Sequence, residues 1–429
     1  MALPLLAGAW ILPGPAQGEP VRVEIRRSEA GFELLRGGKP YYVQGAVYWA
    51  RPDGAVPLEG LAACGANSVR CGGSLVAAIL DAAAGLGMTA TVGLPLKMES
   101  VHGFDYGDPK AVREQLDQMR AMVEKYKDHP ALLFWGVGNE LTVGYKNKKM
   151  WDALNDAAAM VHRLDPNHPT LTTLGDGSIR RGDVEELRTR CPEIDVLGIN
   201  WYKEIETVPQ RVREAGWEKP YLITEWGPSG HWQVPRTKWR VPIEETSTEK
   251  ATRYLQRYQD TMLKDKARCL GSYVFMWGQK QERTHTWYGM FLASGERTEA
   301  VNVMQYLWTG RPPANRAPAI AKLSIDDKQA RDNVLVPPAT PHTVEVAIHD
   351  PEGDPLTFLW EILPEPTQFG YGGRGERKPR PLAELVQETS GATLRFLAPE
   401  ESGNYRVFVI AKDGQGNAAT ANVPFRVEP

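Results

Sequence analysis

Short apolar runs alternate with amphipathic stretches along residues 21–310 of the 429-residue chain. Such alternation is typical of βα units that build a parallel sheet. Several runs are apolar throughout, as expected of parallel strands buried on both faces. The runs predict strands at residues 41–49, 66–70, 88–94, 132–138, 170–174, 195–202, 221–225 and 271–277. Eight βα units in roughly 270 residues match a (β/α)₈ TIM barrel, an α/β fold, which we expect for this part of the chain.

The stretches between the runs carry helix signals. Asp108 followed by Pro109 is an N-cap with proline at the first helical position, and apolar residues then recur at helical spacing up to Tyr126. A second helix is expected from about residue 147 to residue 164. A third begins at Thr246, because Glu249 three positions later completes the spacing of a capping box.

Helical periodicity disappears after the proline-rich segment 311–318. The runs beyond it predict strands at residues 342–350, 356–363, 392–399 and 404–413, with a long loop at residues 368–381. The segments DPEGDPLTFLW (350–360) and GNYRVFVIAKDGQGN (403–417) resemble PKD-like and other bacterial immunoglobulin-like modules. We therefore predict a catalytic barrel over residues 19–312, and a linker with a small all-β immunoglobulin-like sandwich over residues 313–429. The sandwich is interpreted as a spacer or a docking surface.

Composition and charge narrow the classes of function. Apolar residues make up 42% of the chain and charged residues 24%, as in ordinary globular proteins. A net charge of −3 gives no support to nucleic-acid binding, which usually depends on a basic surface. No stretch is long enough to predict a membrane span. Residues 1–18, which begin MALPLLAGAWILPGPAQ, resemble a secretory signal peptide and predict a secreted or periplasmic protein.

Metal and cofactor motifs are missing from the sequence. The four cysteines form no CxxC pair and no Cys/His cluster, so we expect buried thiols and no metal site. Phosphate-binding loops, dinucleotide fingerprints and nucleophile elbows are also absent, so we expect no cofactor.

Polar and aromatic residues gather where the predicted barrel strands end, which is where barrel enzymes have their active sites. Such a mixture is typical of a sugar site, because indole rings stack on the C–H faces of sugars while amides and guanidinium groups bind hydroxyls. The candidates at these ends are Trp49, Arg70, Asn139, Glu140, Asn200, Tyr202, Glu225, Trp226 and Trp277.

Two of these candidates are carboxylic acids that the barrel would bring face to face. Glu140 follows the fourth predicted strand and Glu225 the seventh, and these strands lie roughly across the barrel. One carboxyl can donate a proton to a leaving oxygen while the other attacks the anomeric carbon. The charge of the attacking carboxylate raises the pKa of its neighbour, which separates the two roles. A separation of about 5–5.5 Å would indicate a retaining mechanism.

Six motifs, in chain order, resemble those of the glycoside hydrolase clan A superfamily. GVGNE (136–140) and LITEWG (222–227) are similar to its acid/base and nucleophile signatures. YYVQGAVYW (41–49), NSVR (67–70), NWY (200–202) and FMWG (275–278) are similar to its segments at strands 1, 2, 6 and 8. The barrel looks most like the catalytic domains of family 2 and of the β-1,3-glucanosyltransferases of family 72.

The resemblance implies roles for individual residues. Glu140 would be the general acid/base and Glu225 the nucleophile. Asn139 would hold the sugar 2-hydroxyl, Tyr202 would orient Glu225, and Trp277 would floor the subsite of the cleaved sugar. Arg70 either binds the sugar or forms an ion pair with one of the two glutamates.

Long loops at the same end of the barrel supply further candidate contacts to substrate. They are His102 after the third strand, Trp232 after the seventh, and Trp287 after the eighth.

We thus predict a retaining β-glycoside hydrolase acting on a β-linked glucan, with β-1,3-glucan as the first candidate from the resemblance. A β-glucan transglycosylase would use the same two glutamates, and the sequence leaves these two activities open. The alternative from another class is a carbohydrate-binding protein without catalysis, although a binder needs no pair of opposed carboxyls.

Overall fold

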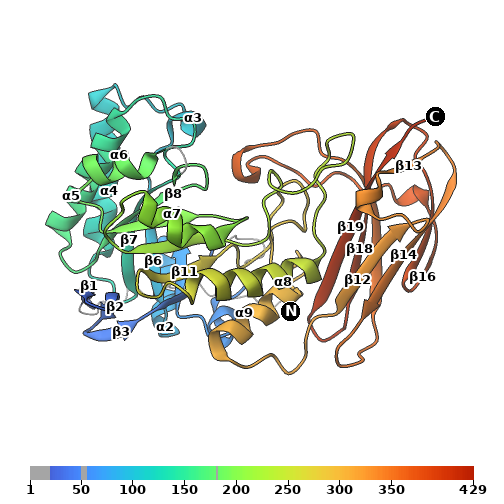
Figure 1. Ribbon diagram of the computed structural model, residues 1–429, viewed down its shortest axis with the longest axis horizontal. Coiled ribbons are helices and arrows are strands. Elements are labelled where there is room, and N and C mark those ends of the chain that lie inside the picture. Colours follow the sequence, from blue (N-terminus) through green and yellow to red (C-terminus); the bar gives the residue numbers. More distant parts are fainter. Residues whose placement is uncertain (1–19, 50–55, 180–181) are drawn as a thin grey trace, which may run out of the picture.

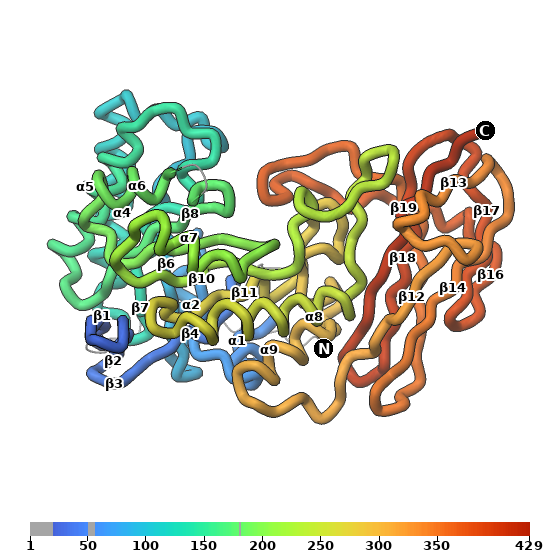
Figure 2. Tube along the Cα trace, viewed as in Figure 1, coloured from blue at the N-terminus to red at the C-terminus, as the bar shows by residue number. Residues whose placement is uncertain are grey.

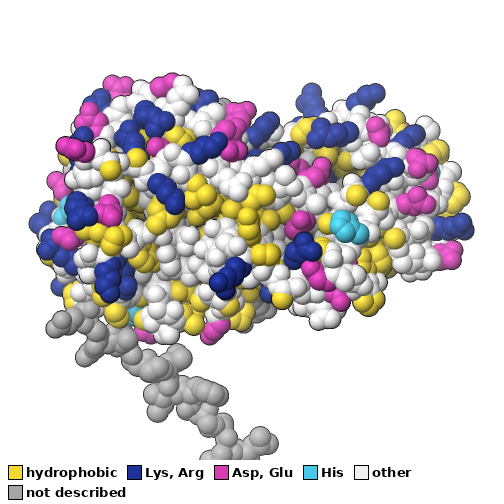
Figure 3. All heavy atoms as spheres, turned by 60° about the horizontal axis from the view of Figure 1, so that its bottom comes forward, with side chains coloured by type: hydrophobic (Ala, Val, Ile, Leu, Met, Phe, Trp, Pro, Cys, Tyr) yellow, Lys and Arg dark blue, Asp and Glu magenta, His cyan; other side chains and the backbone are white. Residues whose placement is uncertain are grey.

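The computed structural model describes residues 20–49, 56–179 and 182–429, so the predicted targeting segment at residues 1–18 lies outside the described residues. A barrel formed by the first part of the chain lies beside a sandwich of two sheets formed by the last part (Figures 1 and 2). Among the described residues, no helix is both long and apolar enough to cross a bilayer. On the face shown in Figure 3, basic and acidic side chains are intermixed.

Parallel strands of the described chain close into a barrel in the order β10-β11-β4-β5-β6-β7-β8-β9. The strands are β4 (Val43–Val47), β5 (Ser68–Cys71), β6 (Thr89–Leu94), β7 (Leu132–Asn139), β8 (Thr170–Leu174), β9 (Val196–Asn200), β10 (Tyr221–Trp226) and β11 (Cys269–Val274). Each coincides with one of the predicted runs, so the predicted barrel is confirmed. Most of its strand residues are fully buried, because the barrel interior covers one face and the helices cover the other.

Helices cover the outside of the barrel (Figure 1). They are α1 (Leu58–Ala63), α2 (Val76–Gly85), α3 (Glu99–His102), α4 (Pro109–Tyr126), α5 (Lys149–Leu164), α6 (Asp183–Arg190), α7 (Val208–Glu214), α8 (Ser247–Arg257) and α9 (Glu299–Thr309). The Asp108 side chain caps α4, and Thr246 and Glu249 form the predicted capping box of α8. All four cysteines are described, buried and free, as expected.

An antiparallel sheet that the sequence did not predict covers the N-terminal end of the barrel. It consists of β1 (Val23–Ser28), β2 (Gly31–Arg36) and β3 (Lys39–Tyr41). Val23 and Leu34 of this sheet belong to the same buried cluster as Leu133 and Leu171 of the barrel strands. The sheet thus closes the end of the barrel opposite the candidate catalytic residues.

Residues 319–427 form two packed sheets. One has the order β12-β14-β17-β16 and the other β13-β19-β18-β15. The strands are β12 (Ala319–Ile325), β13 (Val334–Val336), β14 (Pro341–His349), β15 (Thr357–Pro364), β16 (Val386–Ser390), β17 (Thr393–Leu397), β18 (Gly403–Lys412) and β19 (Ala418–Val427). The predicted all-β character is confirmed, whereas the immunoglobulin-like identity and the domain boundaries stay predictions.

A buried polar network joins the sandwich to the barrel. Glu244, which is 5% exposed, accepts hydrogen bonds from Lys250 Nζ (2.6 Å) and Asn422 Nδ2 (2.8 Å). Arg406 on β18 donates to Pro242 O at 2.9 Å. Charged groups buried across this contact fix the sandwich against the barrel, while its role as a spacer or a docking surface stays a prediction.

We expect Glu244→Ala to lower the free energy of unfolding by about 3–5 kcal/mol, because it leaves the Lys250 ammonium buried without its counter-ion. Urea unfolding followed by circular dichroism measures the change. Asp260→Ala removes one partner of the exposed Lys264–Asp260 pair and serves as the control, with little change expected. An equal, small effect of both substitutions would contradict the importance of the network.

Candidate active site

A cavity of about 580 Å³ lies at the C-terminal ends of the barrel strands, where catalytic residues of such barrels are found. Both candidate glutamates line it. The cavity is also lined by the side chains of Trp49, Asn139, Asp176, Asn200, Tyr202, His231, Trp232, Phe275, Lys280, Glu282, Tyr288 and Tyr371.

Glu140 is turned into the cavity by an unusual backbone conformation. Its φ of 51° lies in the left-handed region that non-glycine residues seldom adopt. The turn is held by hydrogen bonds from Glu140 N to Thr173 O (2.8 Å) and from Val143 N to Glu140 O (3.0 Å). Gly175 lies against the carboxyl, where an added Cβ would come within 3.1 Å of Oε1. Local strain at a residue facing a cavity is typical of a functional position.

Glu225 near the end of β10 accepts hydrogen bonds on both carboxylate oxygens. Arg70 Nη1 donates to Oε1 at 2.7 Å, and Tyr202 Oη donates to Oε2 at 3.2 Å. The Arg70 and Glu225 side chains are 14% and 12% exposed, so the ion pair is largely removed from water. These two donors, one of them charged, fix the orientation of the Glu225 carboxyl group.

Two amides link Glu225 to Glu140. Arg70 Nη2 donates to Asn139 Oδ1 at 2.7 Å. Asn200 Nδ2 donates to Asn139 Oδ1 at 3.2 Å and to Glu140 Oε1 at 3.0 Å, while Asn200 Oδ1 accepts from Thr224 Oγ1 at 2.8 Å. The ends of β5, β7, β9 and β10 are therefore held together by one continuous set of hydrogen bonds.

The two glutamates differ in their electrostatic surroundings. Burial raises the pKa of Glu140 above its ordinary value, and the neighbouring charge of Glu225 raises it further. Hydrogen bonds from Tyr371 and Asn200 and the charge of Arg70 act in the opposite direction without reversing the shift. Glu140 is thus suited to hold a proton, whereas Glu225 is held in an ion pair by the Arg70 guanidinium.

Aromatic side chains form the walls of the cavity. Trp49 and Trp232 are 43% and 47% exposed, so their rings are free to contact a ligand. Phe275 packs edge-on against Trp49, with ring centroids 5.4 Å apart. Lys280 Nζ lies 4.9 Å from the Trp49 ring centroid and is paired with Glu282 at 2.6 Å. Exposed rings of this kind suit the stacking of sugar faces.

Five of the predicted substrate contacts do not line the cavity. One of them, Arg70, lies behind the lining and forms the ion pair with Glu225 that was its alternative role. Trp226 is fully buried against Tyr254 of α8, because its side chain points to the opposite side of β10 from Glu225. Trp277 packs on Phe291, and Trp287 donates from Nε1 to Ser229 O at 3.0 Å, both with 2% or less exposure. His102 is exposed at the end of α3 and accepts at Nδ1 from Met98 N.

The structure brings other residues into the cavity that the sequence did not single out as contacts. Phe275 lies where Trp277 was expected, Asp176 accepts a hydrogen bond from Gln233 Nε2 at 2.7 Å, and Lys280 forms an ion pair with Glu282 at 2.6 Å. Tyr371 comes from the glycine-rich segment QFGYGG of the predicted long loop. The local sequence signal for Tyr371 is an aromatic residue flanked by glycines, a pattern of loops in which the ring is accessible to a ligand.

Two other features lie away from these glutamates. Asp350, Asp354 and Asp413 in the sandwich have carboxylate oxygens within 4.8 Å of one another, close enough to hold a cation; the described residues contain no other such group.

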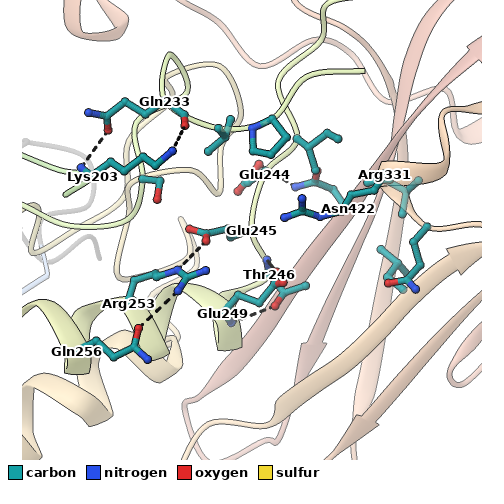
Figure 4. A pocket seen from close by; sticks show the side chains of 18 of the residues that line it. Lys203, Gln233, Glu244, Glu245, Thr246, Glu249, Arg253, Gln256, Arg331 and Asn422 are labelled. Carbon is teal, nitrogen blue, oxygen red and sulfur yellow. Dashed lines mark hydrogen bonds and ion pairs between the residues drawn. The ribbon is translucent and has the colours of Figure 1, made fainter. Parts of the chain in front are cut away.

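A cavity of about 610 Å³ lies at the seam between barrel and sandwich (Figure 4). Its side chains are largely paired with each other, for example Arg253 with Glu245 at 2.9 Å, so it forms part of the contact described above.

Comparisons with known proteins agree with a TIM barrel that carries both glutamates. The sequence profile described as "Glycosyl hydrolases family 2, TIM barrel domain" matches residues 79–299, just over half of the chain, including both glutamates. No curated protein sequence matches the chain.

Several solved structures share the fold. β-Glucuronidase 2 of Bacteroides uniformis aligns with a TM-score of 0.53 and 16% identity over 95% of this chain and 48% of that one. The β-galacturonidase of Eisenbergiella tayi aligns with a TM-score of 0.50 and 17% identity over 68% of this chain and 54% of that one. The β-D-glucuronidase of Dictyoglomus thermophilum gives a TM-score of 0.52, 17% identity and the same coverage. The present chain thus spans about half the length of these proteins.

Proposed function

The chain belongs to family 2 of the glycosyl hydrolases, and on this premise we propose that it is a retaining β-glycoside hydrolase. The observation that carries the proposal is the hydrogen-bonded set Arg70–Glu225–Tyr202 facing Asn200–Glu140 in one cavity. It contains an acid suited to hold a proton and a second carboxyl group paired with an arginine, which supply the acid/base and the nucleophile that a retaining glycosidase requires.

The proposed reaction has two steps. A carboxylate oxygen of Glu225 attacks the anomeric carbon while Glu140 transfers its proton to the departing glycosidic oxygen, which gives a glycosyl ester and a free alcohol. Glu140, now ionised, takes a proton from water, and the water oxygen replaces Glu225 at the anomeric carbon. Asn139 would bind the 2-hydroxyl of the sugar, and Tyr202 would orient Glu225.

The raised pKa of Glu140 gives the reaction a defined pH dependence. The protonated acid is the active form, so kcat/KM is expected to fall as the pH rises through the pKa of Glu140, at values above about 4.3, the ordinary pKa of glutamic acid. Steady-state kinetics on a β-glycoside between pH 4 and 9 locate this fall, which is the basic limb of the pH profile of kcat/KM. Glu140→Gln is expected to remove it, and a limb that persists in that variant would contradict the assignment.

The lining of the cavity supports a neutral sugar as substrate. Its acidic side chains are Glu140, Asp176, Glu225 and Glu282, whereas its lysine, Lys280, is already paired with Glu282. A uronic acid would find Lys280 paired with Glu282 and Arg70 paired with Glu225, and it would face the carboxylate of Asp176, which opposes binding of an anion. We therefore propose a β-linked glucan, and β-1,3-glucan first, following the sequence resemblance. We also propose export, on the signal-like pattern of residues 1–18 alone.

Transfer to a second sugar is the alternative outcome of the same chemistry. The exposed ring of Trp232 at the cavity offers an acceptor sugar a stacking surface, which supports this alternative. In that case a sugar hydroxyl replaces water in the second step.

Product profiling by mass spectrometry tests the proposal. The protein is incubated with β-linked glucans, galactans and mannans, and with β-glucuronides and β-galacturonides because the proteins of similar fold are named for those substrates. Glu225→Gln serves as the blank. Shorter oligosaccharides formed by the wild type alone support hydrolysis, and products longer than the substrate identify a transglycosylase. Binding of a glycan without any cleavage would overturn the proposal.

A further inference from the structure

A tyrosine of the C-terminal sandwich reaches the candidate acid/base residue. Tyr371 lies on the loop between β15 and β16, 231 positions beyond Glu140, and its hydroxyl donates a hydrogen bond to Glu140 Oε2. Gly370 and Gly372 beside it line the same cavity. In Figure 1 this orange loop extends from the sandwich toward the barrel.

Specific contacts hold the loop against the segment that follows β11. Glu376 accepts hydrogen bonds from Arg283 N at 2.7 Å and from Gly370 N at 3.3 Å. The Arg283 guanidinium lies 3.5 Å from the centroid of the Phe369 ring. Gly373 approaches so closely that a Cβ there would lie 2.5 Å from Gln281 O. The position of Tyr371 is therefore set by contacts at both ends of a short stretch of loop.

The two oxygens of Glu140 have different surroundings, and this identifies the side from which a leaving group approaches. Oε1 is taken by Asn200, so Oε2 is the oxygen available to exchange a proton with a glycosidic oxygen. Tyr371 Oη contacts this same oxygen in the free protein. The departing sugar must therefore come to the part of the cavity that the sandwich loop builds.

The ring of Tyr371 is suited to hold that sugar. Tyr371 is 44% exposed although its hydroxyl is bound to Glu140, so a face of the ring is open. An open aromatic face next to the proton donor can stack on the C–H face of a pyranose.

We propose that the C-terminal sandwich completes the active site, with Tyr371 as the residue that binds the leaving-group sugar and determines which glycosides are cleaved. This inference rests on the proposed function. It assigns Tyr371 to specificity and to positioning of Glu140, whereas Glu140 and Glu225 carry out the chemistry.

The proposal separates two kinds of substrate. A β-1,3-linked glucose disaccharide has a sugar as its leaving group and depends on Tyr371, whereas an aryl β-glucoside with an activated leaving group depends on it little. Tyr371→Ala is expected to lower kcat/KM for the disaccharide by about tenfold or more, and for the aryl glucoside by less than about threefold. If the product panel identifies another sugar, the matching disaccharide and aryl glycoside replace this pair.

Tyr371→Phe tests the contact with Glu140 while keeping the ring. The hydrogen bond from Tyr371 lowers the pKa of Glu140, so its loss is expected to move the basic limb of kcat/KM to higher pH. The other charged or titratable groups of the cavity stay unchanged in this variant. They are Asp176, Tyr202, Glu225, His231, Lys280, Glu282 and Tyr288 in its lining, and Arg70 beside Asn139. A purely structural role of the loop would leave the limb where it is.

Tyr405→Phe is the matched control, because it removes a hydroxyl from the same sandwich, where Tyr405 donates to Glu401 O at 3.0 Å. It is expected to keep the wild-type pH profile and substrate preference. Equal losses for both substrates in Tyr371→Ala, or no shift of the limb in Tyr371→Phe, would overturn the inference while the proposed function stands. A wild type that cleaves no glycoside in the panel would overturn both.

Discussion

Glu225→Gln is expected to reduce kcat by roughly 10⁴-fold or more, because the amide oxygen is too weak a nucleophile to form the glycosyl ester. The substitution keeps the size and shape of the side chain, so Arg70 and Tyr202 can still contact it. Binding of substrate is expected to remain. Initial rates on an aryl β-glycoside, together with calorimetric binding of an oligosaccharide, measure the two quantities separately.

Glu218→Gln provides the control for this experiment. Glu218 is exposed before β10 and lies outside the lining of the cavity, so the same chemical change there is expected to leave the activity intact. If Glu225→Gln kept more than a few per cent of wild-type activity, Glu225 could not be the nucleophile.

Glu140→Ala is expected to lower kcat by about 10²–10⁴-fold on substrates whose leaving group needs a proton. On an activated aryl glycoside the first step needs no acid, so the glycosyl ester on Glu225 still forms. Azide then fits the space left by the side chain and attacks the anomeric carbon without base assistance, which releases the Glu225 carboxylate. We expect added azide to restore turnover and to yield a β-glycosyl azide, identified by NMR.

The same reagent distinguishes the two glutamates. In Glu225→Ala, azide would take the place of the nucleophile and react once at the anomeric carbon, so the product would be the α-glycosyl azide. An α-azide from Glu140→Ala, or no rescue in a variant that still binds oligosaccharides, would show that the two roles have been assigned wrongly.

The barrel could be predicted from the sequence because its strands are local and strongly patterned. A parallel strand buried on both faces is a short apolar run, and residues 170–174 are predicted and observed with the same ends. The position of a residue at a strand end then places it at one end of the barrel. Glu140 and Glu225 could be brought together by this rule without knowledge of any contact.

The contribution of individual tryptophans could be predicted only in part. Side chains alternate between the two faces of a strand. If Glu225 points into the barrel, Trp226 must therefore point out of it toward the helices, and this could have been predicted from the strand alone. Trp277 lies beyond the end of β11 at Val274, where alternation no longer applies, and Phe275 lines the cavity in its place. Trp135 on β7 and Trp151 on α5 are fully buried in the core.

The part played by the sandwich could not be predicted from local pattern. The contact of Tyr371 with Glu140 joins two segments far apart in the chain, and it depends on the packing of two domains through residues such as Arg406 and Glu244. A glycine-rich loop has no periodicity that reports where it lies in space. The sequence therefore predicted a separate module, whereas the structure places its loop in the cavity.

Covalent trapping tests the central claim most directly. The protein is incubated with an activated 2-deoxy-2-fluoro-β-glycoside of the sugar found in the product panel, because the fluorine slows breakdown of the glycosyl ester more than its formation. Intact-mass and peptide mass spectrometry then locate the adduct. We expect one fluoroglycosyl group per chain, attached to Glu225. An adduct on another residue, or turnover of the normal substrate with the α-anomer as first product, would contradict the claim.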